Sequence, residues 1–158
     1  MGAIRDFLAA DHDRLDALLA RPRSYEEFRE GLLKHVGMEE MILLPAAKRL
    51  RGRPAALAEK IRLDHGALTA LLVPSPTPEI VAALRAILGP HNELEERAGD
   101  GLYDDCAAAL GAQADLILAQ LRSARDIPPA AHADGPRVMA VVRRALAAAG
   151  YAGLVSGA

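Results

Sequence analysis

Two segments of this sequence carry a histidine and a glutamate four residues apart. His35 and Glu39 lie in HVGMEEMILLP, and His91 and Glu95 lie in HNELEE. On a helix, residues at i and i+4 lie one above the other on the same face. An imidazole and a carboxylate on a buried face are costly unless something pairs with them, and a metal ion is the simplest such partner. The spacing therefore raises the question of whether the chain holds further ligands.

The hydrophobic pattern around these segments is helical, because apolar residues recur three and four positions apart. The loops between the first four expected helices are short, so neighbouring helices run antiparallel. The sequence predicts an all-α fold, an up-and-down four-helix bundle with additional C-terminal helices. We expect the bundle in residues 1–126 and a linker with a short helical extension in residues 127–158. The expected helices span residues 3–20, 24–52, 54–72, 77–98, 102–124 and 134–149.

The ends of these helices are marked by capping residues, glycines and prolines. Ser24 opens a capping-box pattern, SYEE, at the start of the second helix. Gly52 is a plausible C-terminal stop for that helix, and Thr77 is the expected N-cap of the fourth. The Gly89-Pro90 pair predicts a kink, or a break and restart, inside the fourth helix.

Two further histidines extend the candidate ligand set. His12 lies on the apolar stripe of the first helix and His65 on that of the third, and both fall near mid-helix. Two metal ions, each bound by two histidines and sharing both glutamates as bridges, would satisfy the whole set. The candidate ligands are His12, His35, Glu39, His65, His91 and Glu95. The buried face of the second helix is expected to include Phe28, Leu32, Ile42, Ala46 and Leu50.

The alternative explanation of these histidines is structural. A single histidine on an apolar stripe is more often a hydrogen-bonded core residue than a ligand. Here four of the five histidines occupy the stripes of four different helices, which makes chance placement a poor explanation. The fifth, His132, lies in a Pro/Ala-rich linker, where we expect solvated surface.

Several neighbouring side chains are expected to support the site or the core rather than bind metal. Glu40 and Glu96 each follow a candidate ligand by one residue, so salt bridging or support of a ligand is favoured over ligation. Asp16 is expected at the edge of its stripe, and Cys106 as a small buried residue. Tyr103 could reach the site or only pack beside it.

Composition limits the class of protein and its partners. A chain of 158 residues, 51% hydrophobic and 25% charged, fits one globular domain. A net charge of -2 without a basic stripe argues against a nucleic-acid partner. The single cysteine cannot form an internal disulfide, which favours a reducing compartment. The N-terminus has no apolar signal region, and no uncharged apolar run approaches the ~20 residues that span a bilayer. We therefore expect a soluble, cytoplasmic protein without a membrane partner.

The order of these motifs resembles the hemerythrin-like, or HHE cation-binding, family. The resemblance rests on DHDRLDALL, HVGMEEMILLP, LDHGALTALL and HNELEERAGDGLY, and it covers residues 5–105. It implies a four-helix bundle around a non-haem di-iron site. The four histidines of the candidate set would be terminal iron ligands, and Glu39 and Glu95 would be bridges.

The position one turn after His65 bears on the function, because oxygen-carrying hemerythrins have a second histidine there and this chain has Thr69. We expect the Thr69 hydroxyl to point toward the metal, where it could hydrogen-bond a bound diatomic molecule. The difference favours a protein that binds or senses oxygen, nitric oxide or iron over a reversible oxygen carrier. Iron is the expected metal, although manganese and zinc bind the same donor types.

Two other functional classes stay open. One is a di-iron enzyme of the peroxidase, oxidase or nitric oxide reductase type. It ranks lower, because the sequence shows no partner oxidoreductase motif and no catalytic acid beyond the ligands. The other is a metal-free helical module that acts through partner contacts. Nothing in the sequence indicates an oligomeric state.

Overall fold

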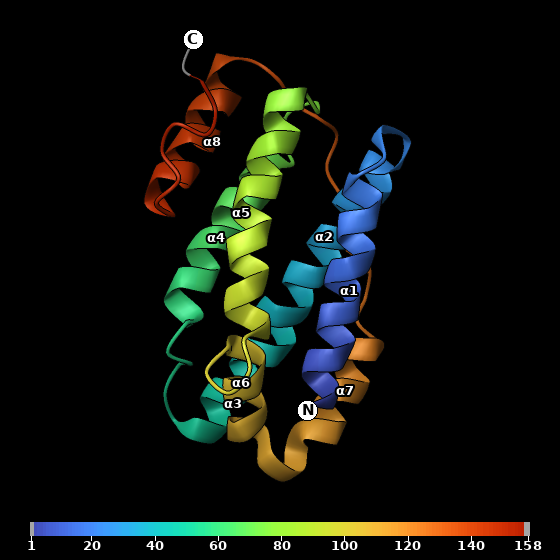
Figure 1. The fold of residues 1–158 in the computed structure, drawn as a ribbon, viewed down its shortest axis with the longest axis vertical. Helices are drawn as coiled ribbons and strands as arrows, with labels where there is room; N and C mark the ends of the chain where they lie inside the picture. Colours follow the sequence, from blue (N-terminus) through green and yellow to red (C-terminus); the bar gives the residue numbers. More distant parts are fainter. Residues whose placement is uncertain (1, 157–158) are drawn as a thin grey trace. The chain divides into compact units, whose positions relative to one another are not determined.

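The computed structural model describes residues 2–156, and none of these residues forms a β-strand (Figure 1). The prediction of an all-α fold is therefore confirmed, whereas the four-helix bundle stays a prediction. The helices are α1 (Ala3–Leu19), α2 (Tyr25–Met38), α3 (Leu44–Arg51), α4 (Ala58–Leu71), α5 (Pro78–Glu96), α6 (Leu102–Leu110), α7 (Ala114–Arg122) and α8 (Pro136–Ala148). Three short helical turns, η1 (Pro22–Ser24), η2 (Glu39–Leu43) and η3 (Gly111–Gln113), join some of them.

The chain divides into two compact units that do not follow chain order. The first unit takes Met1–Ala58 and Asn92–Pro128, and the second takes Glu59–His91 and Pro129–Ala158. The helix α5 supplies residues to both. The predicted boundary between a bundle and an extension at residue 126 stays a prediction, and each unit is described by itself below.

In the first unit, α1 packs along α2, and α3 packs along α6 (Figure 1). The core between them is aliphatic and aromatic, and it includes the fully buried side chains of Leu8, Phe28 and Leu102. Arg51 fixes α3 to α6, because its guanidinium donates to both carboxylate oxygens of Asp105 at 2.7 Å. Burial with Asp105 nearby raises the pKa of the Cys106 thiol to about 12, so this cysteine is a buried neutral residue, as predicted.

In the second unit, the C-terminal segment is tied to α4 and to the turn that follows it. Lys60 Nζ of α4 donates to the carbonyl of Ala149 at 2.9 Å, and Ala133 N donates to the carbonyl of Val73 at 3.0 Å. His132 is half-buried, and its Nδ1–H donates to the Pro74 carbonyl at 3.0 Å. The expectation that His132 is simply solvated was wrong, since the linker lies against this turn.

The second predicted helix is interrupted by a π-helical turn, η2, that begins at Glu39. A π turn holds one more residue than an α turn, so it rotates the buried face of everything that follows it. Leu44, Ala46 and Ala47 are buried after this turn, which confirms the prediction for Ala46, whereas Leu50 is 47% exposed. The predicted burial of Leu50 was therefore wrong. Pro45, which has no N–H to complete the helical ladder, is the second residue of α3, directly after Leu44.

Other helix ends differ from prediction for local reasons. Ser24 lies in the 3₁₀ turn η1 and its side chain makes no capping hydrogen bond, so the capping box does not form. The helix α5 continues through Pro90, so the predicted break does not occur, whereas the kink named as its alternative stays a prediction. Pro90 is exposed, so water can satisfy the carbonyl that its ring leaves without a helical bond. Thr77 does cap α5, because its Oγ1 accepts from Ile80 N at 3.2 Å.

The predicted helix at residues 102–124 is divided, because Gly111 has a φ of +51° and begins a 3₁₀ turn between α6 and α7. The third predicted helix begins at Ala58 rather than at Pro54.

Candidate metal centre

Two histidines of the first unit face one another across the α1–α2 contact. His12 and His35 are both buried, and their ring centroids lie 4.6 Å apart. Their Nε2 atoms approach to 2.9 Å. Leu8 and Leu15 flank His12 on the buried stripe of α1, and this stripe positions the imidazole inside the unit.

The opposite nitrogen of each imidazole is held by a carboxylate. His12 Nδ1 lies 2.5 Å from Glu96 Oε1, and His35 Nδ1 lies 2.8 Å from Asp11 Oδ2. The contact of Glu96 agrees with the supporting role predicted for it. When both Nδ1–H groups donate to carboxylates, both Nε2 atoms present lone pairs, and these face one another at 2.9 Å. A shared cation, either a proton or a metal ion, stabilises that arrangement.

Two buried carboxylates complete a four-residue donor set within the same unit. Glu39 and Glu95 are both 0% exposed. Glu39 Oε1 lies 3.3 Å from His35 Nε2, and Glu95 Oε2 lies 3.2 Å from His12 Nε2. His12, His35, Glu39 and Glu95 each offer one ligand atom, and these atoms all lie within 4.8 Å of one another. Two carboxylates and two imidazoles in a buried cluster could hold a metal ion.

The electrostatics of this cluster favour a positive charge within it. Burial opposes protonation of His35, but Glu39 and the hydrogen bond with Asp11 outweigh it and raise the pKa of His35 to about 10. Burial raises the pKa of Asp11, whereas the contact with His35 lowers it, and the net result is a lowered pKa. A divalent cation between the donors would supply the positive charge that a proton on His35 supplies in its absence.

One residue whose role was open in the sequence lies inside this cluster. Tyr103 of α6 is fully buried, and its hydroxyl lies 2.5 Å from Glu39 Oε1 and 3.0 Å from Glu95 Oε2. Burial, together with these two carboxylates, raises the pKa of Tyr103 well above 10, so the phenol is protonated here and donates a hydrogen bond. Tyr103 therefore reaches the site rather than only packing beside it.

The other two candidate ligands lie together in the second unit. His65 of α4 and His91 of α5 are buried, and their ring centroids lie 5.0 Å apart. His91 Nδ1 lies 3.1 Å from Asp64 Oδ2, and Lys60 Nζ donates to Asp64 Oδ1 at 2.6 Å. Burial opposes the charge on Asp64, but His91 and Lys60 lower its pKa on balance.

The supporting aspartates Asp11 and Asp64 were missed in the sequence, although a signal for both exists. Each directly precedes a candidate ligand in an Asp-His pair, DH at 11–12 and DH at 64–65. In each case the aspartate contacts the histidine of a neighbouring helix rather than the histidine beside it in sequence. The repeated Asp-His pair could therefore have indicated two supporting residues.

Thr69 does not take the role expected from the sequence. Its hydroxyl donates to the His65 carbonyl at 2.7 Å, one turn earlier in α4. The hydroxyl proton is thus used within the helix rather than offered to a bound diatomic molecule. Back-bonding of this kind is common for threonine in helices.

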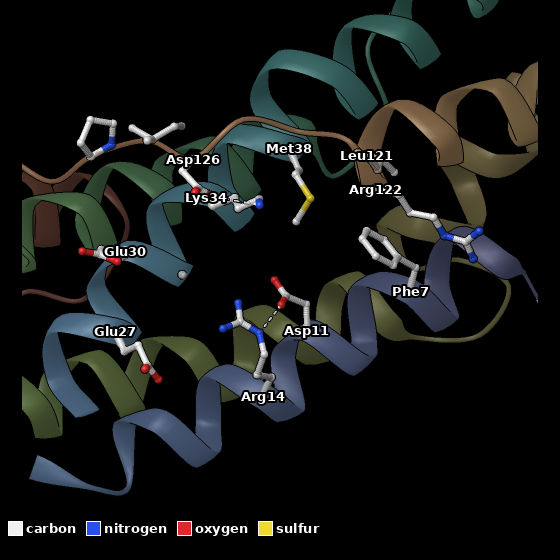
Figure 2. A pocket seen from close by; sticks show the side chains of 13 residues that line it. Phe7, Asp11, Arg14, Glu27, Glu30, Lys34, Met38, Leu121, Arg122 and Asp126 are labelled. Atoms are coloured by element: carbon white, nitrogen blue, oxygen red, sulfur yellow. Dashed lines mark hydrogen bonds and ion pairs between the residues drawn. The ribbon is translucent and has the colours of Figure 1, made fainter. Parts of the chain in front are cut away.

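A cleft of about 740 Å³ opens in the first unit beside Asp11. Figure 2 shows Asp11 and Arg14 of α1 on one wall, with Met38 and Lys34 of α2 across from them. Arg14 Nε donates to Asp11 Oδ1 at 2.8 Å, while Asp11 Oδ2 contacts His35. Asp11 therefore links the wall of the cleft to a candidate ligand.

Comparisons of this chain with protein-family models, with curated proteins and with solved structures find no match. No helix in the described range is both long and apolar enough to cross a membrane. The donor set itself is therefore the feature that points to a function. Its mixture of imidazole nitrogen and carboxylate oxygen suits iron, manganese and zinc.

Proposed function

We propose that this chain is a non-haem metal-binding protein of the hemerythrin-like kind that holds two iron ions and binds or senses oxygen, nitric oxide or iron itself. The observation that supports the proposal is the convergence of four buried donor atoms, from His12, His35, Glu39 and Glu95, within 4.8 Å of one another. Burying two carboxylates and two imidazoles is unfavourable unless a cation compensates them.

The support around the donors also fits ligation. Histidines that bind metal usually donate their second ring N–H to a carboxylate or a carbonyl, which fixes the tautomer and directs the other nitrogen toward the ion. Glu96 and Asp11 stand in that position toward His12 and His35.

The second ion is inferred from the sequence motifs. His65 and His91 are two more buried imidazoles, and Asp64 contacts Nδ1 of His91 in the same manner. The motif order implies that these two bind the second ion and that Glu39 and Glu95 bridge the pair. When bound, such an iron pair supplies a change of oxidation state and an open position for a diatomic ligand. Zinc more often takes a closed, four-coordinate site.

Metal analysis of the purified chain tests the proposal. The protein is stripped with a chelator, loaded anaerobically with Fe(II), freed of excess metal and assayed for iron per chain. Two irons per chain support the di-iron proposal, and one per chain at saturation would overturn its dinuclear part. A chain that binds no Fe(II), Mn(II) or Zn(II) would overturn it entirely. His132→Ala is the control, since His132 lies against the turn after α4 and should leave the metal content unchanged.

A further inference from the structure

The hydroxyl oxygen of Tyr103 contacts all four candidate ligands of the first unit. It lies 2.5 Å from Glu39 Oε1, 3.0 Å from Glu95 Oε2, 3.1 Å from His12 Nε2 and 3.3 Å from His35 Nε2. The phenol carries one proton and can donate it to only one of these four atoms, and each imidazole already directs its Nδ1 toward a carboxylate. The remaining contacts bring acceptor atoms together unless a proton on Nε2 or a metal ion lies between them.

The spacing of these atoms matches that of ligands sharing one ion. Two ligands at right angles, each ~2.1 Å from an ion, are separated by the square root of two times that length, or about 3.0 Å. The four distances from Tyr103, between 2.5 and 3.3 Å, scatter around this value. Neighbouring donors show the same spacing, at 2.9 Å between the two imidazoles and at 3.2 and 3.3 Å between imidazole and carboxylate. The tyrosine oxygen thus lies at the spacing expected of a fifth ligand.

The fold holds Tyr103 in this position from both sides. The next residue, Asp104, accepts from Arg5 of α1 at 2.7 Å, and Asp105 accepts from Arg51 of α3 at 2.7 Å. The chain returns to the site through a tight turn at Gly101, where a Cβ atom would lie 2.3 Å from the Arg97 carbonyl. Only glycine fits that approach. A side chain held this firmly is suited to ligation, which requires ligand atoms fixed within about 0.5 Å.

We propose that Tyr103 is a fifth protein ligand of the ion held by His12, His35, Glu39 and Glu95. The inference rests on the proposed function, since it requires that the first unit bind metal. On ligation the phenol O–H bond breaks and its proton leaves to solvent, while both electrons of that bond remain on the oxygen that binds the ion. The ion keeps its oxidation state. The added negative charge favours Fe(III) over Fe(II). The phenolate oxygen of Tyr103 occupies one coordination position of this ion.

Visible absorption and resonance Raman spectra of the iron-loaded protein test the proposal, because phenolate bound to Fe(III) gives a visible charge-transfer band and characteristic ring vibrations. The protein is loaded with Fe(III) nitrilotriacetate, freed of excess chelate and assayed for iron. We expect the band in the parent protein, its loss in Tyr103→Phe, and its retention in Tyr25→Phe. Tyr25 is the matched control, since it is a buried tyrosine of the same unit that packs against Phe28.

The outcomes separate the two proposals. Iron binding without a phenolate band in the parent protein, or a band that persists in Tyr103→Phe, would overturn the ligand role of Tyr103 and leave the metal-binding proposal intact. A parent protein that binds no iron would overturn both. If Tyr103→Phe does not fold, parent protein made with ring-deuterated tyrosine decides the question, because its Raman bands must shift if a tyrosine is the ligand. Bands that stay in place would overturn the inference.

Discussion

Each unit of the chain buries one pair of histidines, and the two pairs are built in the same way. The rings of His12 and His35 lie 4.6 Å apart in the first unit, and those of His65 and His91 lie 5.0 Å apart in the second. In each pair, one histidine comes from a helix that carries a single histidine, and the other begins a His-x-x-x-Glu motif. The common design indicates a common purpose, which is to direct two imidazole nitrogens toward one place.

The two pairs differ in what surrounds them. The first unit adds two buried carboxylates, both contacted by Tyr103, from its own residues, so this group of residues could hold a metal ion. In the second unit, the buried Asp64 contacts Nδ1 of His91 and is neutralised by Lys60. The contacts of Asp64 therefore suit it to orient the His91 imidazole rather than to bind metal. The first unit thus supplies carboxylates of the donor set from its own residues, whereas the second unit supplies an imidazole pair and the aspartate that supports it.

The largest expected effect follows from removing an anionic ligand of the first unit. Glu39→Ala or Glu95→Ala deletes one of only two buried carboxylates in the donor set and leaves the site short of negative charge. Losing a supporting residue costs about 10–100-fold in metal affinity, so losing a ligand should cost at least about 100-fold. Isothermal titration with Fe(II) under anaerobic conditions measures the loss.

Glu40→Ala is the control for this prediction. Glu40 follows Glu39 in sequence and is half-buried, but it is not among the four residues that converge. Unchanged affinity in Glu39→Ala, or an equal loss in Glu40→Ala, would contradict the assignment of ligands in the first unit.

The second prediction asks whether the second pair binds an ion of its own. Replacing His65 and His91 together by alanine removes both imidazoles of the second unit and leaves the donor set of the first unit unchanged. We expect iron to fall from two ions per chain to one. Elemental analysis after Fe(II) loading gives the count, and circular dichroism shows whether the variant keeps its helices. Retention of two irons per chain would show that these histidines are core residues.

The parts of the fold that the sequence predicted are those decided by local chemistry. The helical class follows from hydrophobic periodicity, and the ends at Gly52 and Thr77 follow from a left-handed glycine and a capping hydroxyl. The exposure of Leu50 was not predictable in this way, because it depends on the π turn at Glu39–Leu43. The continuation of α5 through Pro90 was not predictable either, because a proline inside a helix is tolerated where it faces solvent.

In the candidate site too, local sequence patterns predict some of the residues and not others. Glu39 follows His35 by four residues within one helix, so periodicity alone placed the two on one face. The positions of Asp11 and Tyr103 depend on contacts between helices, and no pattern within one segment specifies such contacts. The turn through Gly101 that returns Tyr103 to Glu95 depends on close packing of the backbone. Periodicity therefore finds ligands on regular helices but not the residues that complete the site from elsewhere.

A third prediction compares the two supporting aspartates. Asp11 lies at the edge of the cleft (Figure 2) and is 15% exposed. Asp64 is 0% exposed and lies between His91 and Lys60. Asp11→Asn and Asp64→Asn should each weaken metal binding by about 10–100-fold, because an amide holds the imidazole tautomer less firmly than a carboxylate. Asp64→Asn should in addition destabilise the metal-free protein by about 1–3 kcal/mol, since a buried charge-assisted network is broken.

Metal titration and urea unfolding measure these two effects, and Asp13→Asn, an exposed change on α1, is the control. If the Asp64 and Asp11 variants unfold at the same urea concentration, the stability of the metal-free protein depends no more on the buried aspartate beside the second histidine pair than on the one beside the first.

The smallest expected effect concerns how the second unit holds its C-terminal segment. Glu79 Oε1 accepts hydrogen bonds from both N and Oγ of Ser156 at 2.6 Å, and these bonds lower the pKa of Glu79 below its ordinary value of 4.5. A carboxyl whose pKa is lowered on folding stabilises the native state above its unfolded pKa, and this contribution is lost as the pH falls through the folded pKa.

Glu79→Gln keeps the shape of the side chain and one acceptor atom but removes the charge. We therefore expect a slightly lower melting temperature than the parent at pH 7 and a difference that narrows as the pH falls below 4.5. Thermal melts at both pH values measure it, with the exposed Glu59→Gln on α4 as control. A difference that stays constant across this range would mean that other contacts, such as the hydrogen bond from Lys60 Nζ to the Ala149 carbonyl, hold the C-terminal segment, and not the charge on Glu79.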